Sequence, residues 1–248
     1  MISADRAWIS RCEDFEQSVL RYKNVRFSRF VSSHELEVFR TQVKLSPFVS
    51  ALAFGGTADC ERKMLGFFPD YLEPEESAFP ITPLLISGVE GLTHRDILGA
   101  VLGLGIKREL TGDIFVEADR AVLMCDSSIA DFLMLSFKTV GRNKVEISVC
   151  PPDATLTLQH PFALSRSVVA SMRLDAVVGA MAHLSRAEAQ ALILGEGVNL
   201  NFAPCVDTAK KVQEGDVFSI RHHGRFVLES ITGETKKGRI AIAIKKYI

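Results

Sequence analysis

The clearest pattern of apolar positions lies in the last third of the chain. Apolar residues recur there at i, i+3, i+4, i+7 and i+8: Leu174, Val177, Val178, Met181 and Ala182. This spacing predicts a helix that buries one face. A second helix is predicted from Ser185, because Glu188 lies three residues on and completes a capping box. Gly195 and Gly197 are expected to end it.

The chain after these helices alternates between apolar and polar residues. Strands are predicted over "VNLNF" (198–202), after Gly215–Asp216, after "HHG" (222–224) and after "GETKKG" (233–238). In the last of these strands three isoleucines share one face: Ile240, Ile242 and Ile244. We expect both helices to pack against this small sheet.

The middle of the chain alternates between strand and helix patterns. The stretches are, in order, "PLLIS", "THRDILGAVLGLG", "GDIFV", "AVLMC", "SSIADFLMLSFKTVG" and "VEISV". Thr93 and Asp96 cap the first helix, and the second is expected to group its apolar residues largely on one face: Ile129, Phe132, Leu133, Leu135, Ser136 and Val140. The order β-α-β-β-α-β predicts a ferredoxin-like domain over residues 79–160.

The first 78 residues show a mixed pattern. A helical repeat starts near Ala7, and a second helix is predicted with Ser32 as N-cap and Glu35 three residues on. Two strands follow in "FVSALAFGG" and "RKMLGFF", and Pro69–Ser77 is the predicted linker. The expected fold class is α+β, with a mixed domain at 1–78, a ferredoxin-like domain at 79–160 and a small domain at 165–248.

Composition narrows the class of protein. The formal net charge of −1 over 248 residues gives no global nucleic-acid signature. Five scattered cysteines argue against a disulfide framework and a zinc site, so we expect reduced, mostly buried thiols. The N-terminal residues lack a hydrophobic signal segment, and the longest apolar run, Ile97–Ile106, is about half of what a bilayer requires. These features predict a cytoplasmic protein without a membrane partner.

The charge is nevertheless distributed unevenly. The last 30 residues contain seven basic side chains against only Glu229 and Glu234. The basic residues are Arg221, Arg225, Lys236, Lys237, Arg239, Lys245 and Lys246. This cluster predicts a basic C-terminal face on an otherwise acidic protein.

Two arginines are placed at the starts of the predicted C-terminal helices. Arg173 lies in the first turn of one, and Arg186 follows the N-cap of the other. A cation at a helix N-terminus is unfavourable by a few tenths of a kcal/mol or more. Free N–H groups at a helix start also bind phosphate. We therefore expect an external anion to compensate both arginines.

The stretch "RLDAVVGAMAHLSRAEAQALILGEGVNLN", followed by "EGDVFSIR", resembles the S-four-type (alpha-L) RNA-binding domain. Arg173, Ser185 and Arg186 match the RNA-facing positions of that pattern. The chain departs from it at Phe202, where a glycine often follows the asparagine.

The resemblance extends to "FGGTADCERKMLGFFP", "LTHRDILGAVLGLGIKRELTGDI" and "IRHHGRFVLESITGETKKGRIAI". With these stretches the chain, from about Phe54 onward, is similar to the YlmH family of bacterial proteins. The family implies RNA binding through the C-terminal domain. It also implies association with large ribosomal subunits carrying obstructed peptidyl-tRNA, in ribosome-associated quality control. A weaker link connects the family to cell division in firmicutes and to photosystem maintenance in photosynthetic relatives.

The candidate RNA contacts follow from the motif and the basic cluster: Arg173, Ser185, Arg186, Arg221, Arg225, Lys236, Lys237 and Arg239. Ser185 has an alternative role as a helix cap only, and the basic cluster as a solvated sheet edge. Asp175 is expected to orient Arg173 or to cap the helix. His222 and His223 are interpreted as a polar turn rather than a metal site.

Two further motifs have alternative interpretations. "HRD" at His94–Asp96 lacks the other parts of a kinase signature. It belongs either to an internal Arg–Asp network or to a second RNA or ribosome surface with Arg95, Lys107 and Arg108. "FGG" at Phe54–Gly56 is interpreted as the turn that ends a strand.

The hypothesis with most support is a non-enzymatic, monomeric RNA-binding protein without metal or cofactor. Its partners would be structured RNA, namely rRNA with tRNA as a further candidate, and the large ribosomal subunit. Two alternatives remain: an RNA-modifying enzyme of the pseudouridine synthase type, since "RLD" imitates that motif, and a protein–protein adaptor linked to cell division.

Overall fold

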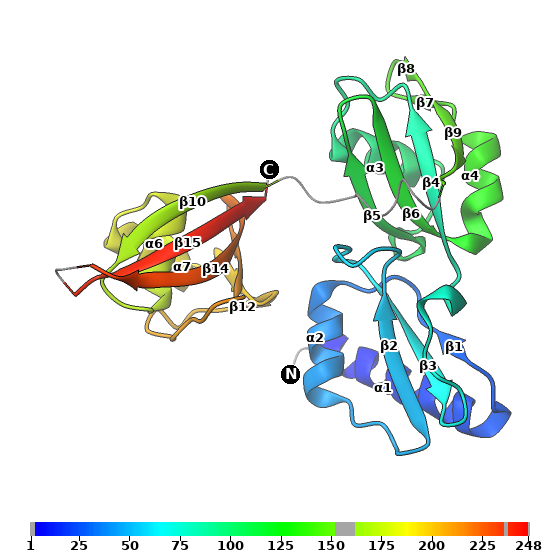
Figure 1. Cartoon of the computed structure of the whole chain (residues 1–248), viewed down its shortest axis with the longest axis horizontal. Helices are drawn as coiled ribbons and strands as arrows, with labels where there is room; N and C mark the ends of the chain where they lie inside the picture. Colours follow the sequence, from blue (N-terminus) through cyan, green and yellow to red (C-terminus); the bar gives the residue numbers. More distant parts are fainter. Residues whose placement is uncertain (1–2, 152–161, 236–237, 248) are drawn as a thin grey trace. The chain divides into compact units, whose positions relative to one another are not determined.

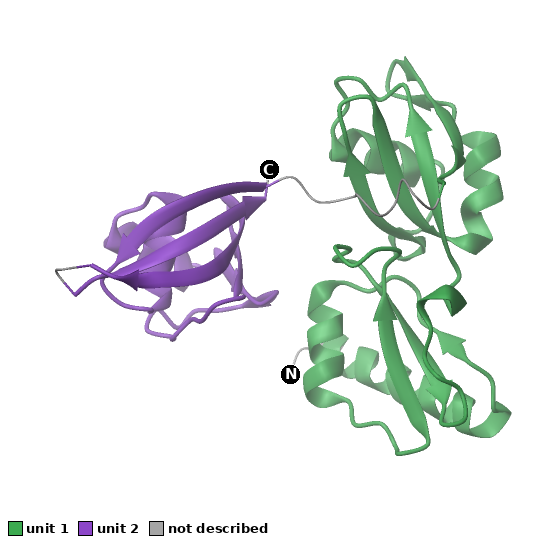
Figure 2. Cartoon of the chain, in the orientation of Figure 1, with its two compact units in different colours: residues 1–159 green, residues 160–248 purple. Residues whose placement is uncertain are grey.

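The structure is a computed structural model that describes residues 3–151, 162–235 and 238–247. The chain divides into two compact units, residues 1–159 and residues 160–248 (Figure 2). The first two predicted domains, 1–78 and 79–160, thus fall almost entirely within unit 1, and the predicted C-terminal domain falls within unit 2.

The N-terminal part of unit 1 is a small sheet covered by two helices (Figure 1). Its elements are α1 (Ser3–Tyr22), β1 (Arg26–Phe27), α2 (Ser33–Gln42), β2 (Val49–Phe54), β3 (Met64–Pro69) and the 3-10 turn η1 (Glu76–Ala78). The strands are antiparallel in the order β1-β3-β2. Ser32 and Glu35 form the predicted capping box at the start of α2. Trp8 and Cys12 of α1 pack against Leu65 and Phe67 of β3.

The middle part of unit 1 has the predicted ferredoxin-like arrangement. Its elements are β4 (Ile81–Ser87), α3 (His94–Gly103), η2 (Arg108–Leu110), β5 (Thr111–Val116), β6 (Arg120–Asp126), η3 (Ser127–Ile129), α4 (Ala130–Ser136), β7 (Thr139–Val140), β8 (Asn143–Lys144) and β9 (Glu146–Val149). The four main strands lie in the order β5-β6-β4-β9, and all neighbours are antiparallel. This is the strand order of a split βαβ unit, and the α+β fold class is confirmed.

The predicted helix over "SSIADFLMLSFKTVG" is shorter than expected. Its first residues form the 3-10 turn η3, where Asp126 accepts hydrogen bonds from the Ser128 backbone N at 3.0 Å and from the Ser128 hydroxyl. The helix α4 ends at Ser136, and Val140 lies in the β7–β8 hairpin. The predicted single apolar face was wrong for Phe132 and Leu135, which are exposed.

Both faces of the middle sheet are buried at β5 and β6. Side chains alternate along a strand, so residues of β6 point in turn to the two faces. Ala121, Leu123 and Cys125 pack in the core beneath α3 and α4. Val122 and Met124 belong to a second core that also contains Phe30, Cys60, Met64 and Phe68 from the N-terminal part. This second core joins the first two predicted domains into one unit.

Unit 2 is a six-stranded antiparallel sheet with two helices (Figure 1). Its elements are β10 (Phe162–Val169), α6 (Leu174–Ala182), α7 (Arg186–Leu194), β11 (Val198–Leu200), β12 (Ala203–Pro204), β13 (Val217–Ile220), β14 (Gly224–Glu234) and β15 (Ile240–Tyr247). The strand order is β10-β15-β14-β13-β11-β12. The sequence analysis did not predict β10, which pairs with β15 along eight residues.

The core of unit 2 follows the predicted apolar pattern. All five residues of the α6 stripe are buried, and they pack with Ala189 and Ile193 of α7 and with Ile242 and Ile244 of β15. The Ser185–Glu188 capping box is present at the start of α7. The strand predicted over 198–202 ends at Leu200, because Asn201 and Phe202 have φ angles of 49° and 68°. Phe202 thus holds the left-handed conformation that a glycine adopts easily.

All five cysteines are free and buried. Burial raises the pKa of the thiols of Cys12 and Cys125 to about 12 and that of Cys60 to about 11. Such thiols are poor nucleophiles at neutral pH. Among the described residues, no helix is long and apolar enough to cross a membrane.

The packing of the middle sheet on the N-terminal part predicts that a side chain at position 112, in place of Gly112, destabilises unit 1. A Cβ added there would lie 2.7 Å from the Phe30 ring and 2.9 Å from the Met124 Cβ. Gly112→Ala should therefore destabilise unit 1 by about 1–3 kcal/mol, because neither neighbour can move without disturbing the core. Urea unfolding followed by the fluorescence of Trp8, which lies in unit 1, measures this change.

Gly99→Ala is the matched control. Gly99 lies within α3, where an added Cβ would meet nothing within 4 Å. This substitution should leave stability unchanged or raise it by about 0.5–1 kcal/mol. An equal effect of the two substitutions would contradict the packing argument.

Candidate nucleic-acid interface

One buried carboxylate organises the side chains at the starts of α6 and α7. Asp175 has no exposed surface. The Arg173 guanidinium donates to it from Nε at 3.1 Å and from Nη2 at 3.2 Å. Arg186 Nε donates at 3.1 Å, and Gln190 Nε2 at 2.8 Å. Arg186 and Gln190 are four residues apart on α7 and thus share one helix face.

The electrostatics of this cluster follow from its charges. Burial alone would raise the pKa of Asp175, but hydrogen bonds from Arg173, Gln190 and Arg186 outweigh burial and hold the pKa well below its ordinary range. Two guanidinium charges against one carboxylate leave a local charge of +1. The side chains of Arg173 and Arg186 remain 36% and 66% exposed.

The cluster corrects the expectation that an external anion must compensate both arginines. Asp175 supplies the opposing charge from inside the fold. Arg173 is also the N-cap residue of α6 rather than a member of its first turn. The prediction that Asp175 orients Arg173 is confirmed.

The backbone N–H groups at the start of α6 are occupied, and one of those at the start of α7 is capped. Leu174 N donates to Lys210 O at 2.8 Å, and Asp175 N donates to Thr208 O at 3.1 Å. At α7 the Ser185 hydroxyl accepts from Glu188 N at 3.3 Å, so this hydroxyl serves as the predicted cap. At the start of α6 the phosphate-binding capacity therefore resides in the Arg173 guanidinium and not in free helix N–H groups.

A surface hollow of about 280 Å³ lies beside the cluster. Its lining comes from residues 167–171 at the end of β10, from one side of α6, and from Asp175 and Arg186. Arg186 thus lines a concave surface of a size that admits a small polar group.

Arg221 and Arg225 line a different hollow of about 440 Å³. Arg221 Nη2 donates to Glu196 O at 3.3 Å, and the Arg225 guanidinium lies 5.8 Å from the centre of the Phe202 ring. Glu196 follows the C-terminus of α7, whereas Arg186 begins this helix. Nine helical residues span about 13 Å, so the two hollows lie at opposite ends of α7.

Of the three remaining candidate RNA contacts, only Arg239 lies among the described residues. Arg239 is exposed, and its backbone N donates to the Thr235 hydroxyl at 3.1 Å. Lys236 and Lys237 lie outside the described residues. His222 and His223 form part of the turn between β13 and β14, and His222 has a φ of 64°.

The middle domain contains the expected internal network, but with different members. Arg108 is partly buried and donates to Thr111 O at 2.7 Å and to Gly112 O at 3.2 Å. Burial and the nearby charge of Arg62 lower the pKa of Arg108 to about 10. The Arg62 guanidinium donates in turn to Phe30 O at 2.9 Å and to Thr111 O at 3.1 Å. The bond from Arg62 to Thr111 O thus holds the N-terminal part against the middle sheet, whereas the bonds of Arg108 lie within the middle domain.

Of the "HRD" stretch, Asp96 caps α3. Its carboxylate accepts from Thr93 N at 2.8 Å and from the Thr93 hydroxyl at 2.6 Å. Arg95 is exposed, as is Lys107. Gly56 of "FGG" has a φ of 109°, and a Cβ there would lie 2.6 Å from the Met124 sulfur, so this stretch is a packed turn.

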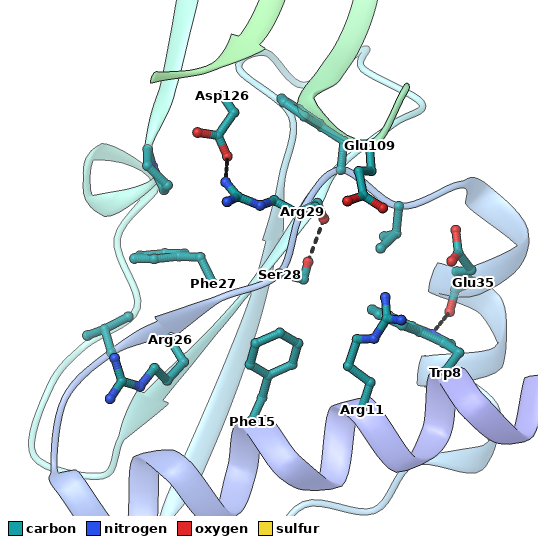
Figure 3. Close-up of a pocket in the computed structure, with 14 residues that line it drawn as sticks. Trp8, Arg11, Phe15, Arg26, Phe27, Ser28, Arg29, Glu35, Glu109 and Asp126 are labelled. Atoms are coloured by element: carbon teal, nitrogen blue, oxygen red, sulfur yellow. Dashed lines mark hydrogen bonds and ion pairs between the residues drawn. The ribbon is translucent and has the colours of Figure 1, made fainter. Parts of the chain in front are cut away.

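A third hollow, of about 500 Å³, lies in unit 1 between α1 and the segment before α2 (Figure 3). Arg11 and Glu109 point into it, and Arg29 pairs with Asp126 at its edge. Its lining holds the three arginines Arg11, Arg26 and Arg29 against the three carboxylates Glu35, Glu109 and Asp126. Because these charges balance, the hollow has no preference for anions.

The comparisons with known proteins agree with this architecture. Residues 74–153 match the family model described as "Putative RNA-binding domain in YlmH". A Bacillus subtilis (strain 168) protein named ribosome-associated protein quality control protein P2 is 29% identical over 245 residues, which cover 98% of this chain and 95% of that protein. The solved structure of the cell division protein ylmH from Streptococcus pneumoniae matches with a TM-score of 0.53 at 24% identity, over 63% of this chain and 96% of that one.

The fold and these matches define an α+β protein with an RNA-binding type of middle domain and a small C-terminal unit that carries exposed arginines. The chain is thus similar to YlmH over residues 74–153 and to the Bacillus subtilis protein over nearly its full length.

Sequence reasoning missed two features of the site. It placed its main candidate RNA contacts in unit 2 and gave Arg95, Lys107 and Arg108 only as an alternative, whereas the matched domain lies at residues 74–153. It also did not assign a role to Gln190, the third donor to Asp175. The spacing of Arg186 and Gln190 on one helix face was the available signal for the second feature.

The central position of Asp175 predicts a loss of stability in Asp175→Asn. The variant should lower the free energy of unfolding of unit 2 by about 1–3 kcal/mol at neutral pH, since it removes the charge that two arginines share. Because the pKa of Asp175 is lowered in the folded state, its stabilisation is present above the unfolded pKa of about 4 and decreases as the pH falls below it. The difference between variant and wild type should therefore shrink below about pH 4.

Calorimetry of the full chain between pH 3 and pH 8 measures this difference. The single tryptophan, Trp8, identifies the transition of unit 1 by its fluorescence. Asp131→Asn, at an exposed position of α4, is the control and should leave the transition of unit 2 unchanged. A pH-independent difference for Asp175→Asn would contradict the charge-based explanation.

Proposed function

We propose that this chain is an RNA-binding protein that acts on the ribosome. Its role would be to bind the large subunit and its peptidyl-tRNA in ribosome-associated quality control. The match of residues 74–153 to an RNA-binding domain and the near full-length similarity to the Bacillus subtilis protein support this role. The observation that carries the proposal is the pair of exposed guanidinium groups that Asp175 fixes in unit 2.

The binding mechanism would be electrostatic. A guanidinium group presents paired N–H donors that match the oxygens of a phosphate. Arg173 and Arg186 use part of these donors on Asp175, which leaves the outer part of each group for the RNA backbone. Structured RNA offers its phosphates at fixed spacing and is recognised mainly by shape and backbone. Arg221 and Arg225 extend this contact toward the other end of α7, and Arg239, Lys236 and Lys237 complete the proposed set.

The surroundings of Asp175 favour binding over catalysis. An RNA-modifying enzyme of the pseudouridine synthase type would need an accessible carboxylate in "RLD". The Asp175 carboxylate is buried and accepts hydrogen bonds from three side chains. We therefore propose no enzymatic activity, and we expect no change in nucleoside masses after incubation of the protein with rRNA.

The variant Arg186→Ala tests the proposal. Arg186 is the better choice, because Asp175 keeps Arg173 and Gln190 as partners and the fold should persist. The variant should bind purified large ribosomal subunits more weakly in cosedimentation. The slope of log affinity against log salt should become shallower by about 1, as expected for one lost phosphate contact.

Arg40→Ala, which removes an exposed arginine from α2, is the matched control. Arg186→Lys should bind more weakly than wild type but more strongly than Arg186→Ala, because lysine keeps the charge and loses the planar fork. Unchanged cosedimentation of Arg186→Ala at every salt concentration would count against this surface. Nuclease treatment of the subunits separates an RNA contact from a protein contact.

A further inference from the structure

The middle domain differs from common RNA-binding domains of similar fold in one respect. RNA-recognition-motif domains bind RNA on the open face of a four-stranded sheet, where exposed aromatic side chains stack on bases. In this chain α3 and α4 cover one face of the four-stranded sheet, and the N-terminal part covers the other. The face that would stack bases is inside the protein.

The contacts at this covered face are close. Phe115 of β5, Val122 and Met124 of β6 are all buried, in one core with Phe30 and Met64 of the N-terminal part. The Phe30 ring approaches Gly112 so closely that no side chain fits between them. The hydrogen bonds from Arg62 Nε to Thr111 O and from Phe30 N to Glu109 O, at 3.1 Å and 2.9 Å, cross the same junction. RNA therefore has no access to this face at β5 and β6 without separation of a packed core.

The opposite side of the domain offers a basic hollow of about 430 Å³. It lies between α3 and the β7–β8 hairpin and is lined by Leu92, Arg95, Asp96, Gly99, Ala100, Val140, Gly141, Arg142 and Asn143. Arg95 and Arg142 are both exposed. Added Cβ atoms at Gly99 and Gly141 would meet nothing within 4 Å, so the surface beside both arginines is open.

The charge and polarity of this hollow suit a phosphodiester backbone. Two guanidinium groups face a single carboxylate, Asp96, and that carboxylate is already bound by the N and the hydroxyl of Thr93. Asn143 Nδ2 donates to Glu90 O at 3.3 Å, which ties the hairpin to the loop before α3. The lining contains no aromatic side chain that could stack on a base.

We propose that RNA contacts the middle domain on its helical side, through the phosphate backbone at Arg95 and Arg142, and not on its sheet. This inference rests on the proposed function, since it assumes that the chain binds ribosomal RNA. It adds a second RNA-binding surface, in a different unit from Arg173 and Arg186.

The double variant Arg95→Ala/Arg142→Ala tests the proposal in the full chain. The probe is the purified large ribosomal subunit, and affinity is measured over a range of salt concentrations. The slope of log affinity against log salt should become shallower by about 2, one for each lost phosphate contact. Arg95→Lys/Arg142→Lys should restore most of that slope, because it keeps both charges.

The matched control is Arg6→Ala/Arg40→Ala, which removes the same charge from exposed positions of α1 and α2. Its slope should equal that of wild type. Trp8 fluorescence in urea checks that unit 1 stays folded in every variant. Hydrogen exchange gives a second readout: subunit binding should protect residues 92–100 and 138–144.

The outcomes separate this inference from the proposed function. If wild type does not bind large subunits, both fail. If wild type binds and Arg95→Ala/Arg142→Ala binds with the same slope, only the present inference fails. If the double variant loses affinity for subunits but keeps its affinity for protein-free rRNA, the hollow contacts a ribosomal protein and the inference is overturned.

Discussion

The burial of both faces of β5 and β6 in the middle sheet is the constraint on which the rest of unit 1 depends. Val122 and Met124 need the N-terminal part as a cover, because a sheet with two apolar faces cannot leave one in water. The polar groups at this junction are satisfied as well: Arg62 and Arg108 donate to backbone carbonyls that would otherwise lose water without compensation. The N-terminal part therefore determines which side of the middle domain a partner can reach.

Local signals in the sequence predicted the fold well. The capping boxes at Ser32, Thr93 and Ser185 are all present, because such a motif needs only residues three positions apart. Features that depend on contacts between distant parts of the chain were harder to predict. Phe132 and Leu135 follow a helical repeat but lie outside the core, since α4 ends early and the hairpin after it takes Val140 inward. The β10 segment is largely exposed, so its alternation is weak, and only pairing with β15 makes it a strand.

The candidate interface shows the same difference between local motifs, which the sequence predicted, and long-range contacts, which it did not. The motif around Arg173 and Arg186 drew attention to two arginines at helix starts, and their charges raised the question of what compensates them. The answer depends on tertiary structure, because only the packing of α7 against α6 brings Arg186 and Gln190 to Asp175. The number of residues between Asp175 and Arg186 does not reveal this contact. Likewise, the strand order predicted the ferredoxin-like domain but not which of its faces is covered.

The shared carboxylate has a consequence for binding. A free arginine side chain carries about 2 kcal/mol of rotamer entropy, which a partner must remove when it immobilises the side chain. Asp175 already restricts Arg173 and Arg186 in the unbound protein, so most of that entropy is lost during folding. A rigid ligand with phosphates at matching positions would then bind with little further ordering of the protein. A flexible polyanion would still have to order its own chain, and unit 2 should discriminate against it on entropic grounds.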